Sequence, residues 1–175
     1  GDVILTTGIH GLSKLGFLIK NKIYLDNDIS LNKRLISKSI EHFCRPKVYP
    51  NFLKNLIKTR SNKKIKRIGC TDSSDGLFQA LQDLASASKC KAIINYEKIP
   101  KDKDWPRGDK WDEYYFFGGE DYELVFSLPK KWAKNLSKLD KDINEIGFFA
   151  DGEPSIEFKD SNKNKLLNNT PFKHF

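Results

Sequence analysis

The chain has 175 residues, of which 31 are Lys or Arg and 23 are Asp or Glu, for a formal net charge of +8. This length suits one domain with a core of its own. The 12 Phe, 6 Tyr and 3 Trp supply aromatic surface for burial, which argues against disorder. No apolar run approaches the ~20 residues that span a bilayer, and the amino end lacks a signal-peptide pattern. We therefore expect a soluble, cytoplasmic domain without membrane contact.

The chain contains no Met and opens on Gly1 and Asp2, followed at once by an apolar stretch. Because translation begins with Met, we expect residues 1–175 to be a carboxy-terminal piece of a longer polypeptide. Activity would then require residues outside this sequence.

Three cysteines, Cys44, Cys70 and Cys90, lie far apart and form no CxxC pair. Their odd number and wide spacing argue against a disulfide framework and against a zinc site. We expect small buried side chains in a reducing compartment.

The first half of the sequence alternates apolar patterns with turn signals. A β-type apolar run leads into a glycine-containing joint, and apolar residues recur at helical spacing in four later segments. Arg45-Pro46 and Pro50 break the second of these, and Asn51 suits a helix start. The expected elements are strands over 3–7 and 68–70 and helices over 14–20, 31–43, 52–58 and 77–87.

The second half is richer in strands. Tyr122, Leu124, Phe126 and Leu128 alternate strictly, which predicts a strand with these four side chains on a core face. The expected elements are strands over 91–96, 122–128, 143–149 and 156–158, a helix over 129–139, and polar loops over 97–112 and 160–165. About four to six strands flanked by four or five helices define an α+β fold.

The segment Asp72-Ser73-Ser74-Asp75-Gly76-Leu77 lies between an expected strand end and a helix start. Two carboxylates with a hydroxyl between them suit Mg²⁺, and the amino end of a helix favours a phosphate group. The simpler interpretation is that Ser74 or Asp75 caps the helix while Gly76 eases the turn. The six residues by themselves favour this second interpretation.

The segment Gly118-Gly119-Glu120-Asp121-Tyr122-Glu123-Leu124 combines paired glycines with acids at the start of a strand. Glycines let a backbone approach a ligand or a neighbouring loop, and loop acids are common in binding sites. A glycine-rich turn with solvated acids explains the same residues, so the segment alone does not separate the two interpretations.

Gly8-x-x-Gly11-x-Ser13 resembles a phosphate loop but lacks the Gly-Lys-Ser/Thr ending. We expect a tight joint between a strand and a helix. His10, His42 and His174 show no spacing typical of a metal site or a nucleophile triad, so we expect structural or exposed roles.

The basic balance of the chain invites nucleic-acid binding, notably through the run Lys63 to Arg67. Lysines are nevertheless spread along the whole chain, and no aromatic-plus-basic motif of the RNA-binding type occurs. We expect a solvated surface or a rim that attracts polyphosphate, and no nucleic acid partner.

Taken in order, the motifs resemble one known family. The most specific are Asp72-x-Ser74-Asp75-Gly76-Leu77, Gly118-Gly119-Glu120-Asp121-Tyr122-Glu123-Leu124 and the terminal His174-Phe175. With the opening strand, its glycines, Arg45-Pro46 and Ile146-Gly147, the chain resembles the carboxy-terminal domain of the thiamine-monophosphate kinase family over essentially its whole length. That family belongs to the aminoimidazole ribonucleotide synthetase superfamily.

The resemblance implies a mixed β-sheet flanked by helices, as in the carboxy-terminal domain of aminoimidazole ribonucleotide synthetase. It implies a two-domain enzyme whose amino-terminal half, outside this chain, binds ATP and most of the Mg²⁺ and forms a homodimer. The reaction would transfer the γ-phosphoryl group of ATP to thiamine monophosphate, giving thiamine diphosphate. Positioning and charge neutralisation dominate such reactions, so carboxylates that hold Mg²⁺ fit the chemistry.

Carried over by position, the resemblance implies that Asp72 and Asp75 bind Mg²⁺ and that Ser74 contacts the nucleotide. Glu120 would lie on the thiamine side, and Phe172 would pack against the substrate. The chain departs from the family pattern at Ser73, where an apolar residue is usual, and in the looser segment 47–50. Neither departure removes an implied ligand.

Two alternatives stay open. Another ATP-using member of the superfamily, such as selenophosphate synthetase, a hydrogenase-maturation enzyme or a purine-pathway enzyme, would share the fold. A non-catalytic module that binds polyanions would show salt-dependent affinity for RNA without a requirement for Mg²⁺.

Overall fold

The computed structural model describes residues 1–23, 31–60 and 67–168. One six-stranded sheet has the order β2-β4-β1-β5-β3-β6. Its pairs are antiparallel except for β3 and β6, which run parallel, so the sheet is mixed as expected. The strands are β1 (Val3–Thr7), β2 (Gly69–Asp72), β3 (Lys91–Ile94), β4 (Leu124–Leu128), β5 (Ile143–Ala150) and β6 (Ser155–Phe158).

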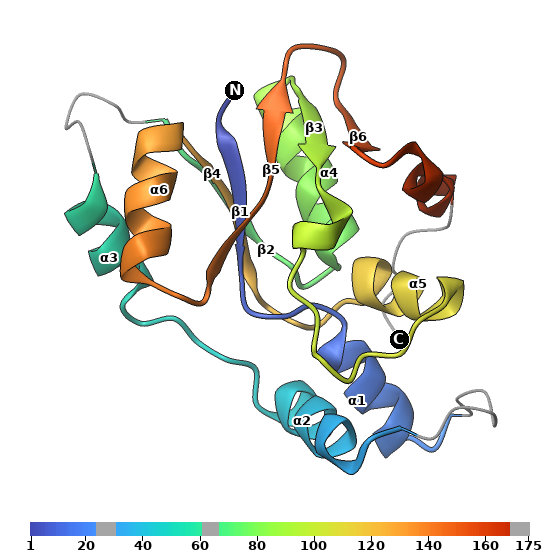
Figure 1. Cartoon of the computed structure of the whole chain (residues 1–175). Coiled ribbons are helices and arrows are strands. Elements are labelled where there is room, and N and C mark those ends of the chain that lie inside the picture. Colours follow the sequence, from blue (N-terminus) through green and yellow to red (C-terminus); the bar gives the residue numbers. More distant parts are fainter. Residues whose placement is uncertain (24–30, 61–66, 169–175) are drawn as a thin grey trace.

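Helices cover both faces of this sheet (Figure 1). Helices α3 and α6 lie on one face, α4 and α5 on the other, and α1 and α2 pack together beyond one end of the strands. The α-helices are α1 (Leu12–Lys20), α2 (Lys33–Cys44), α3 (Phe52–Thr59), α4 (Leu77–Ser88), α5 (Asp109–Phe117) and α6 (Lys130–Leu139), with 3-10 helices η1 (Tyr96–Lys98) and η2 (Ser161–Asn168). The α+β prediction is confirmed. Among the described residues, no helix combines the length and apolar character that a bilayer crossing needs.

Strands β1 and β4 are buried on both faces because each separates two cores. Ile4 and Val125 belong to the larger core under α4 and α5, whereas Leu5 and Phe126 belong to the core under α3 and α6. Alternating side chains of a strand point to opposite faces, so two central strands serve both cores. The predicted alternation therefore holds for the strand itself.

Tyr122 does not join that core face, contrary to the expectation. Strand β4 begins only at Leu124, and Tyr122 is 42% exposed with a backbone φ of 54°. A left-handed residue interrupts the extended backbone that alternation requires. Tyr122 is thereby turned to the surface next to the end of β2.

The expected polar loop over 97–112 is wrong at its carboxyl end. Helix α5 begins at Asp109 and buries Trp111, Tyr115, Phe116 and Phe117. Aromatic residues have modest helix propensity, and a segment that is apolar on several sides shows no clear amphipathic pattern. Residues 161–168 likewise form η2 instead of a solvated loop, and Leu166 reaches the larger core.

The cysteine expectation is half right. All three thiols are free, but Cys44 and Cys70 are exposed and Cys90 is only partly buried. Cys70 lies on β2, an edge strand whose side chains alternate between partly buried and exposed. Cysteine at such a position does not serve as a small core residue.

The buried aromatic residues of α5 lead to a test of the fold. Phe116 is fully buried, so Phe116→Ala should lower the free energy of unfolding by about 3–5 kcal/mol, measured by urea denaturation. Phe148→Ala is the matched control, because Phe148 is 38% exposed and should cost clearly less. Equal losses for the two variants would contradict the core assignment.

Candidate functional site

The two acidic motifs meet at one edge of the sheet. Strand β2 ends at Asp72, which pairs with Leu124 at the start of β4. The segments that follow β2 and precede β4 are therefore neighbours, although they are far apart in the sequence. The amide of Glu120 donates a hydrogen bond to the Ser74 carbonyl at 2.7 Å, which joins the motifs directly.

Ser73 forms a second bridge between the motifs. Its amide donates to the Glu123 carbonyl at 2.9 Å, and its Oγ accepts a hydrogen bond from the Glu123 amide at 3.1 Å. The Ser73 side chain is fully buried, so the hydroxyl needs such a partner. The residue that departs from the family pattern thus holds the positions of Asp72 and Ser74 on either side of it.

Three acids act on one tyrosine hydroxyl at this edge, and one of them contacts it. The Tyr122 hydroxyl donates to Glu120 Oε2 at 2.8 Å. This hydrogen bond is the main reason that the pKa of Tyr122 is raised. The negative charges of Asp72 and Asp75 raise it further, because they disfavour the phenolate. We call Asp72, Ser74, Asp75, Glu120 and Tyr122 the acidic edge.

Within the acidic edge, Asp72 also orders its own turn. Asp72 Oδ1 accepts hydrogen bonds from the Ser74 amide at 3.0 Å and from Ser74 Oγ at 2.7 Å. Gly76, not Ser74 or Asp75, occupies the N-cap of α4, and its φ of 94° confirms that this glycine eases the turn. The fifth implied residue, Phe172, lies outside the described residues.

A buried carboxylate beneath this edge connects it to the first glycine loop. Asp121 Oδ2 accepts a hydrogen bond from the Gly11 amide at 2.6 Å, and Oδ1 accepts one from the Ser13 amide at 2.9 Å. Gly11 is the N-cap of α1, with a φ of 83°. The free amides at the amino end of a helix need acceptors, and here the two oxygens of Asp121 supply them. The predicted tight joint between a strand and a helix is confirmed. Its Gly11 and Ser13 amides already bind the side chain of Asp121.

Burial dominates the electrostatics of Asp121. It raises the pKa of this fully buried carboxyl to about 7, against the opposing effect of the Ser13 and Gly11 amides. The imidazole of His42 lies 3.5 Å from Asp121 Oδ1. Burial lowers the pKa of His42, because it disfavours the charged imidazolium. Two ionisable groups in contact are thus both shifted toward their neutral forms.

The residues that flank Asp121 carry unusual backbone angles. Glu120 has a φ of 67° and Tyr122 a φ of 54°, both in the left-handed region that non-glycine residues rarely adopt. Such residues are strained by about 1–3 kcal/mol each and persist only where surrounding contacts enforce them. The two hydrogen bonds to Asp121 supply that constraint, so Glu120 and Tyr122 face outward together.

Glu123 extends the same network to the segment before α3. Its Oε2 accepts hydrogen bonds from Thr7 Oγ1 at 2.5 Å and from the Tyr49 hydroxyl at 2.6 Å. Burial raises the pKa of Glu123, and the Thr7 and Tyr49 bonds partly offset this. Gly8, with a φ of 52°, passes so close that an added Cβ would overlap the Glu123 carboxylate. The segment around Tyr49 is therefore anchored beside the acidic edge.

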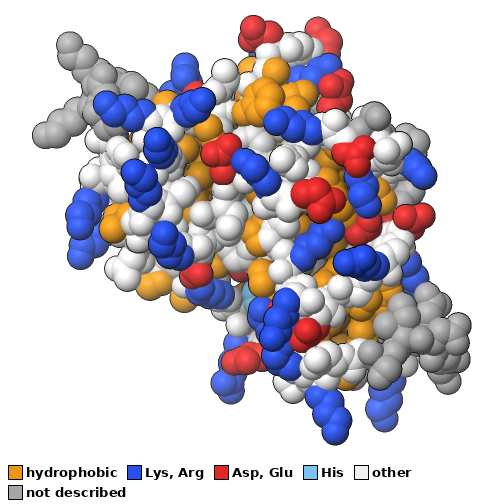
Figure 2. Space-filling model, in the orientation of Figure 1, with side chains coloured by type: hydrophobic (Ala, Val, Ile, Leu, Met, Phe, Trp, Pro, Cys, Tyr) orange, Lys and Arg blue, Asp and Glu red, His pale blue; other side chains and the backbone are white. Residues whose placement is uncertain are grey.

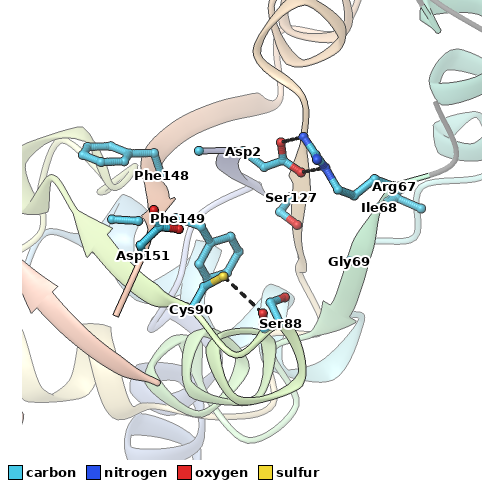
Figure 3. A pocket seen from close by; sticks show the side chains of 12 residues that line it. Asp2, Arg67, Ile68, Gly69, Ser88, Cys90, Ser127, Phe148, Phe149 and Asp151 are labelled. Carbon is cyan, nitrogen blue, oxygen red and sulfur yellow. Dashed lines mark hydrogen bonds and ion pairs between the residues drawn. The ribbon is translucent and has the colours of Figure 1, made fainter. Parts of the chain in front are cut away.

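Two hollows differ in their relation to this edge. A groove of about 630 Å³ shares Asp72 and Tyr122 with it and is otherwise lined by the segment 46–50, the start of α3 and Leu124. Another pocket, of about 670 Å³, lies at the opposite end of the strands (Figure 3). The Asp2–Arg67 ion pair and Cys90 line that pocket, and no residue of the acidic edge does.

The acidic edge offers two aspartates, Asp72 and Asp75, whose carboxylate oxygens are of the ligand type that Mg²⁺ accepts. In the described ranges, no group of three or more His, Cys, Asp or Glu is arranged to hold a metal ion. Mg²⁺ at phosphate sites typically takes one or two protein carboxylates and fills the rest of its shell with phosphate oxygens and water. Asp72 and Asp75 match that smaller contribution.

The fold and this edge define a class of protein. The family model described as "AIR synthase related protein, C-terminal domain" matches residues 1–156. The chain belongs to this family.

Within the family, the chain is similar to thiamine-monophosphate kinases. The enzyme of that name from Prochlorococcus marinus is 33% identical over 175 residues, which cover 100% of this chain and 53% of that protein. The structure described as "AaThiL complexed with AMPPCP and TMP" has a TM-score of 0.72 and 26% identity, covering 100% of this chain and 52% of that one. The chain thus spans about half the length of these relatives.

The hydrogenase maturation protein HypE of E. coli shares the fold. Its structure has a TM-score of 0.58 at 16% identity and covers 90% of this chain and 46% of that one. Identity at this level supports a common fold alone.

The buried carboxylate gives a pH-dependent prediction. Because the pKa of Asp121 rises from about 3.9 in the unfolded chain to about 7, its stabilising contribution is complete below pH 4 and is lost as pH rises through 7. Asp121→Asn lacks one acceptor for the two amides and should lose about 1–3 kcal/mol at pH 5. The stability gap to wild type should narrow by pH 8, measured by urea unfolding.

Asp151→Asn, at an exposed turn, is the matched control and should show no such pH-dependent gap. A gap for Asp121→Asn that widens with pH would mean that the carboxyl is stabilised in its charged form.

Proposed function

We propose that this chain is the carboxy-terminal domain of an enzyme that phosphorylates thiamine monophosphate with ATP. The product would be thiamine diphosphate. The observation that carries the proposal is the 2.7 Å bond from Glu120 to Ser74, which unites the two family motifs in one acidic edge. Similarity along the whole chain to an enzyme named thiamine-monophosphate kinase supports the substrate.

The roles proposed for the first motif follow from phosphoryl-transfer chemistry. Donor and acceptor are both anionic phosphates, so a bound cation supplies charge neutralisation between them. Asp72 and Asp75 would hold Mg²⁺ from the protein side. Ser74 would contact the nucleotide, with its hydroxyl oriented by the 2.7 Å bond to Asp72 Oδ1. AMPPCP, an ATP analogue, occupies the similar solved complex.

Glu120 is proposed to face the thiamine part of the substrate. A carboxylate suits a cationic thiazolium or an aminopyrimidine donor. The Tyr122 hydroxyl fixes this carboxylate at 2.8 Å, and the left-handed backbone on both sides of Asp121 turns it toward the surface. Phe172 is proposed to add an aromatic contact with the substrate, a role that stays a prediction.

The rest of the enzyme would lie outside this chain. We propose that residues 1–175 are one domain and that an amino-terminal half supplies the ATP pocket, most magnesium ligands and a homodimer interface. Coverage of 53% of the Prochlorococcus relative agrees with such a division. The cellular location is proposed to be cytoplasmic. The chain alone would fold but not turn over substrate.

The alternatives have less support. Similarity to HypE extends to the fold alone, and no described feature favours that chemistry. For a polyanion-binding module we would expect basic residues gathered over one element. Helix α6 does carry four lysines and no acid, whereas elsewhere on the face drawn in Figure 2 Lys and Arg side chains are interspersed with acids. Similarity along the whole chain to an enzyme named thiamine-monophosphate kinase is what ranks this alternative behind. The run Lys63 to Arg67 lies almost wholly outside the described residues.

The first test measures thiamine diphosphate formation by the full-length polypeptide with thiamine monophosphate and Mg²⁺-ATP. Asp72→Asn should reduce turnover by about 100-fold or more, because charge stabilisation at the transferring phosphoryl group is lost. Asp83→Asn, on the outer side of α4, is the matched control and should keep full activity. If the polypeptide binds ATP but forms no thiamine diphosphate, the proposed substrate is wrong, and another ATP-using enzyme of the superfamily becomes the better candidate.

A second test asks whether Glu120 contacts thiamine monophosphate or the nucleotide. Tyr122→Phe removes the hydroxyl that orients Glu120, and a hydrogen bond to a charged group is worth about 1.5–3 kcal/mol. We expect KM for thiamine monophosphate to rise about 10-fold or more, with KM for ATP unchanged. Tyr114→Phe, which removes a hydroxyl from α5, should alter neither. An equal rise of both KM values would contradict the proposal that Tyr122 and Glu120 act on the thiamine side of the site.

A further inference from the structure

An apolar surface lies beside the acidic edge. Val48 is 78% exposed, Leu53 63%, Ile57 64% and Tyr122 42%, which makes four of the eight large apolar side chains that the described residues expose. Val48, Leu53 and Tyr122 line the groove of about 630 Å³, and Ile57 follows Leu53 by one helical turn. We call these four residues the α3 surface.

The outer row of α3, Leu53 and Ile57, is mostly exposed. Helix α3 is fixed from its inner side, where Phe52 packs edge-on against Phe126 with ring centroids 5.0 Å apart. The indole of Trp132 also donates to the Leu56 carbonyl at 2.9 Å. Leu53 and Ile57, four residues apart, share the opposite side and meet water. Contiguous exposed apolar residues of this kind mark interaction sites.

We propose that the α3 surface binds the amino-terminal half of the same polypeptide. This inference rests on the proposed two-domain organisation and adds to it the place of contact. The occupant is an apolar segment of that half, seated in the groove and along the outer side of α3.

The length of chain outside the structure is the first reason for this occupant. The chain covers 53% of the Prochlorococcus relative and 52% of the solved ATP-analogue complex, so a part of similar size is available to cover the surface.

The position of the groove is the second reason. Asp72 and Tyr122 belong both to the groove and to the acidic edge. The acidic edge is proposed to be one wall of a cleft whose other wall is the amino-terminal half. A segment of that half that closes the cleft over Asp72 and Tyr122 passes directly beside the groove.

Charge is the third reason, and it argues against a second copy of this chain. Lys54 and Lys58 are exposed on α3 next to Leu53 and Ile57, whereas Lys47 in the groove is already paired with Asp142. A second copy meeting this surface face to face would bring the same lysines into opposition, and like charges at an interface are unfavourable. A partner with an apolar centre and an acidic rim fits better.

The experiment compares solvent access to α3 in the 175-residue chain and in the full-length polypeptide. Leu53→Cys is placed in a background where Cys44, Cys70 and Cys90 are replaced by Ser, and the rate of thiol alkylation is measured. Ser86→Cys, exposed on α4 across the sheet, is the matched control. We expect Leu53→Cys to react at least about 10-fold more slowly in the full-length polypeptide, and Ser86→Cys to react equally in both.

Hydroxyl-radical footprinting of Leu53 and Ile57 in the unsubstituted proteins is the second measurement, in case the cysteine-free background does not fold. Equal access in the short and full-length proteins by either method would overturn the proposal. Protection in the 175-residue chain that grows with its concentration would assign the surface to a second copy and also overturn it.

Neither measurement depends on ATP or on turnover, so the two proposals can fail separately. If α3 is protected but the full-length polypeptide has no kinase activity, the proposed function is wrong and the proposed contact at α3 stands. If the polypeptide has kinase activity but α3 is unprotected, the proposed contact is wrong and the proposed function stands.

Discussion

The buried carboxylate of Asp121 is the contact on which the rest of the acidic edge depends. Its two oxygens accept hydrogen bonds from the Gly11 and Ser13 amides at 2.6 and 2.9 Å, which ties the first turn of α1 to the approach of β4. With Asp121 fixed inward, Glu120 and Tyr122 must turn outward through left-handed backbone angles. The amide of Glu120 then meets the Ser74 carbonyl, and two distant motifs become one surface.

The acidic edge has the character of half a site. Two aspartates, a serine and a glutamate held by Tyr122 suit a cation and a substrate, yet the described residues do not enclose either. The apolar groove that shares Asp72 and Tyr122 continues the same face. A carboxylate edge and an unpartnered apolar surface in continuity are what one wall of a cleft between two domains requires, and the family relationship agrees with that division.

Much of this architecture could be predicted from local patterns. The strand over Val3–Thr7, the helix after Gly76 and the helix after Pro129 were all recognisable, because apolar periodicity and turn residues act over short distances. Asp72, Ser74, Asp75 and Glu120 were singled out as motif residues, and the roles that the family resemblance implies for them stay predictions. Helix α5 was missed, because its aromatic residues become helical by packing into the larger core and not by an amphipathic pattern. Phe172 remains a prediction.

By itself, the sequence determined the α+β class, through local periodicity, and the family, through the order of its motifs. Only the tertiary structure decided that the two acidic motifs meet and which of their acids is buried. Glu120 and Asp121 are adjacent and chemically alike, yet Glu120 is only partly buried and Asp121 is fully buried. The partners that bury Asp121 come from 108 and 110 residues away, and no local pattern records them. Burial and hydrogen bonds to residues distant in the sequence therefore distinguish Asp121, a structural acid, from Glu120, a candidate functional one.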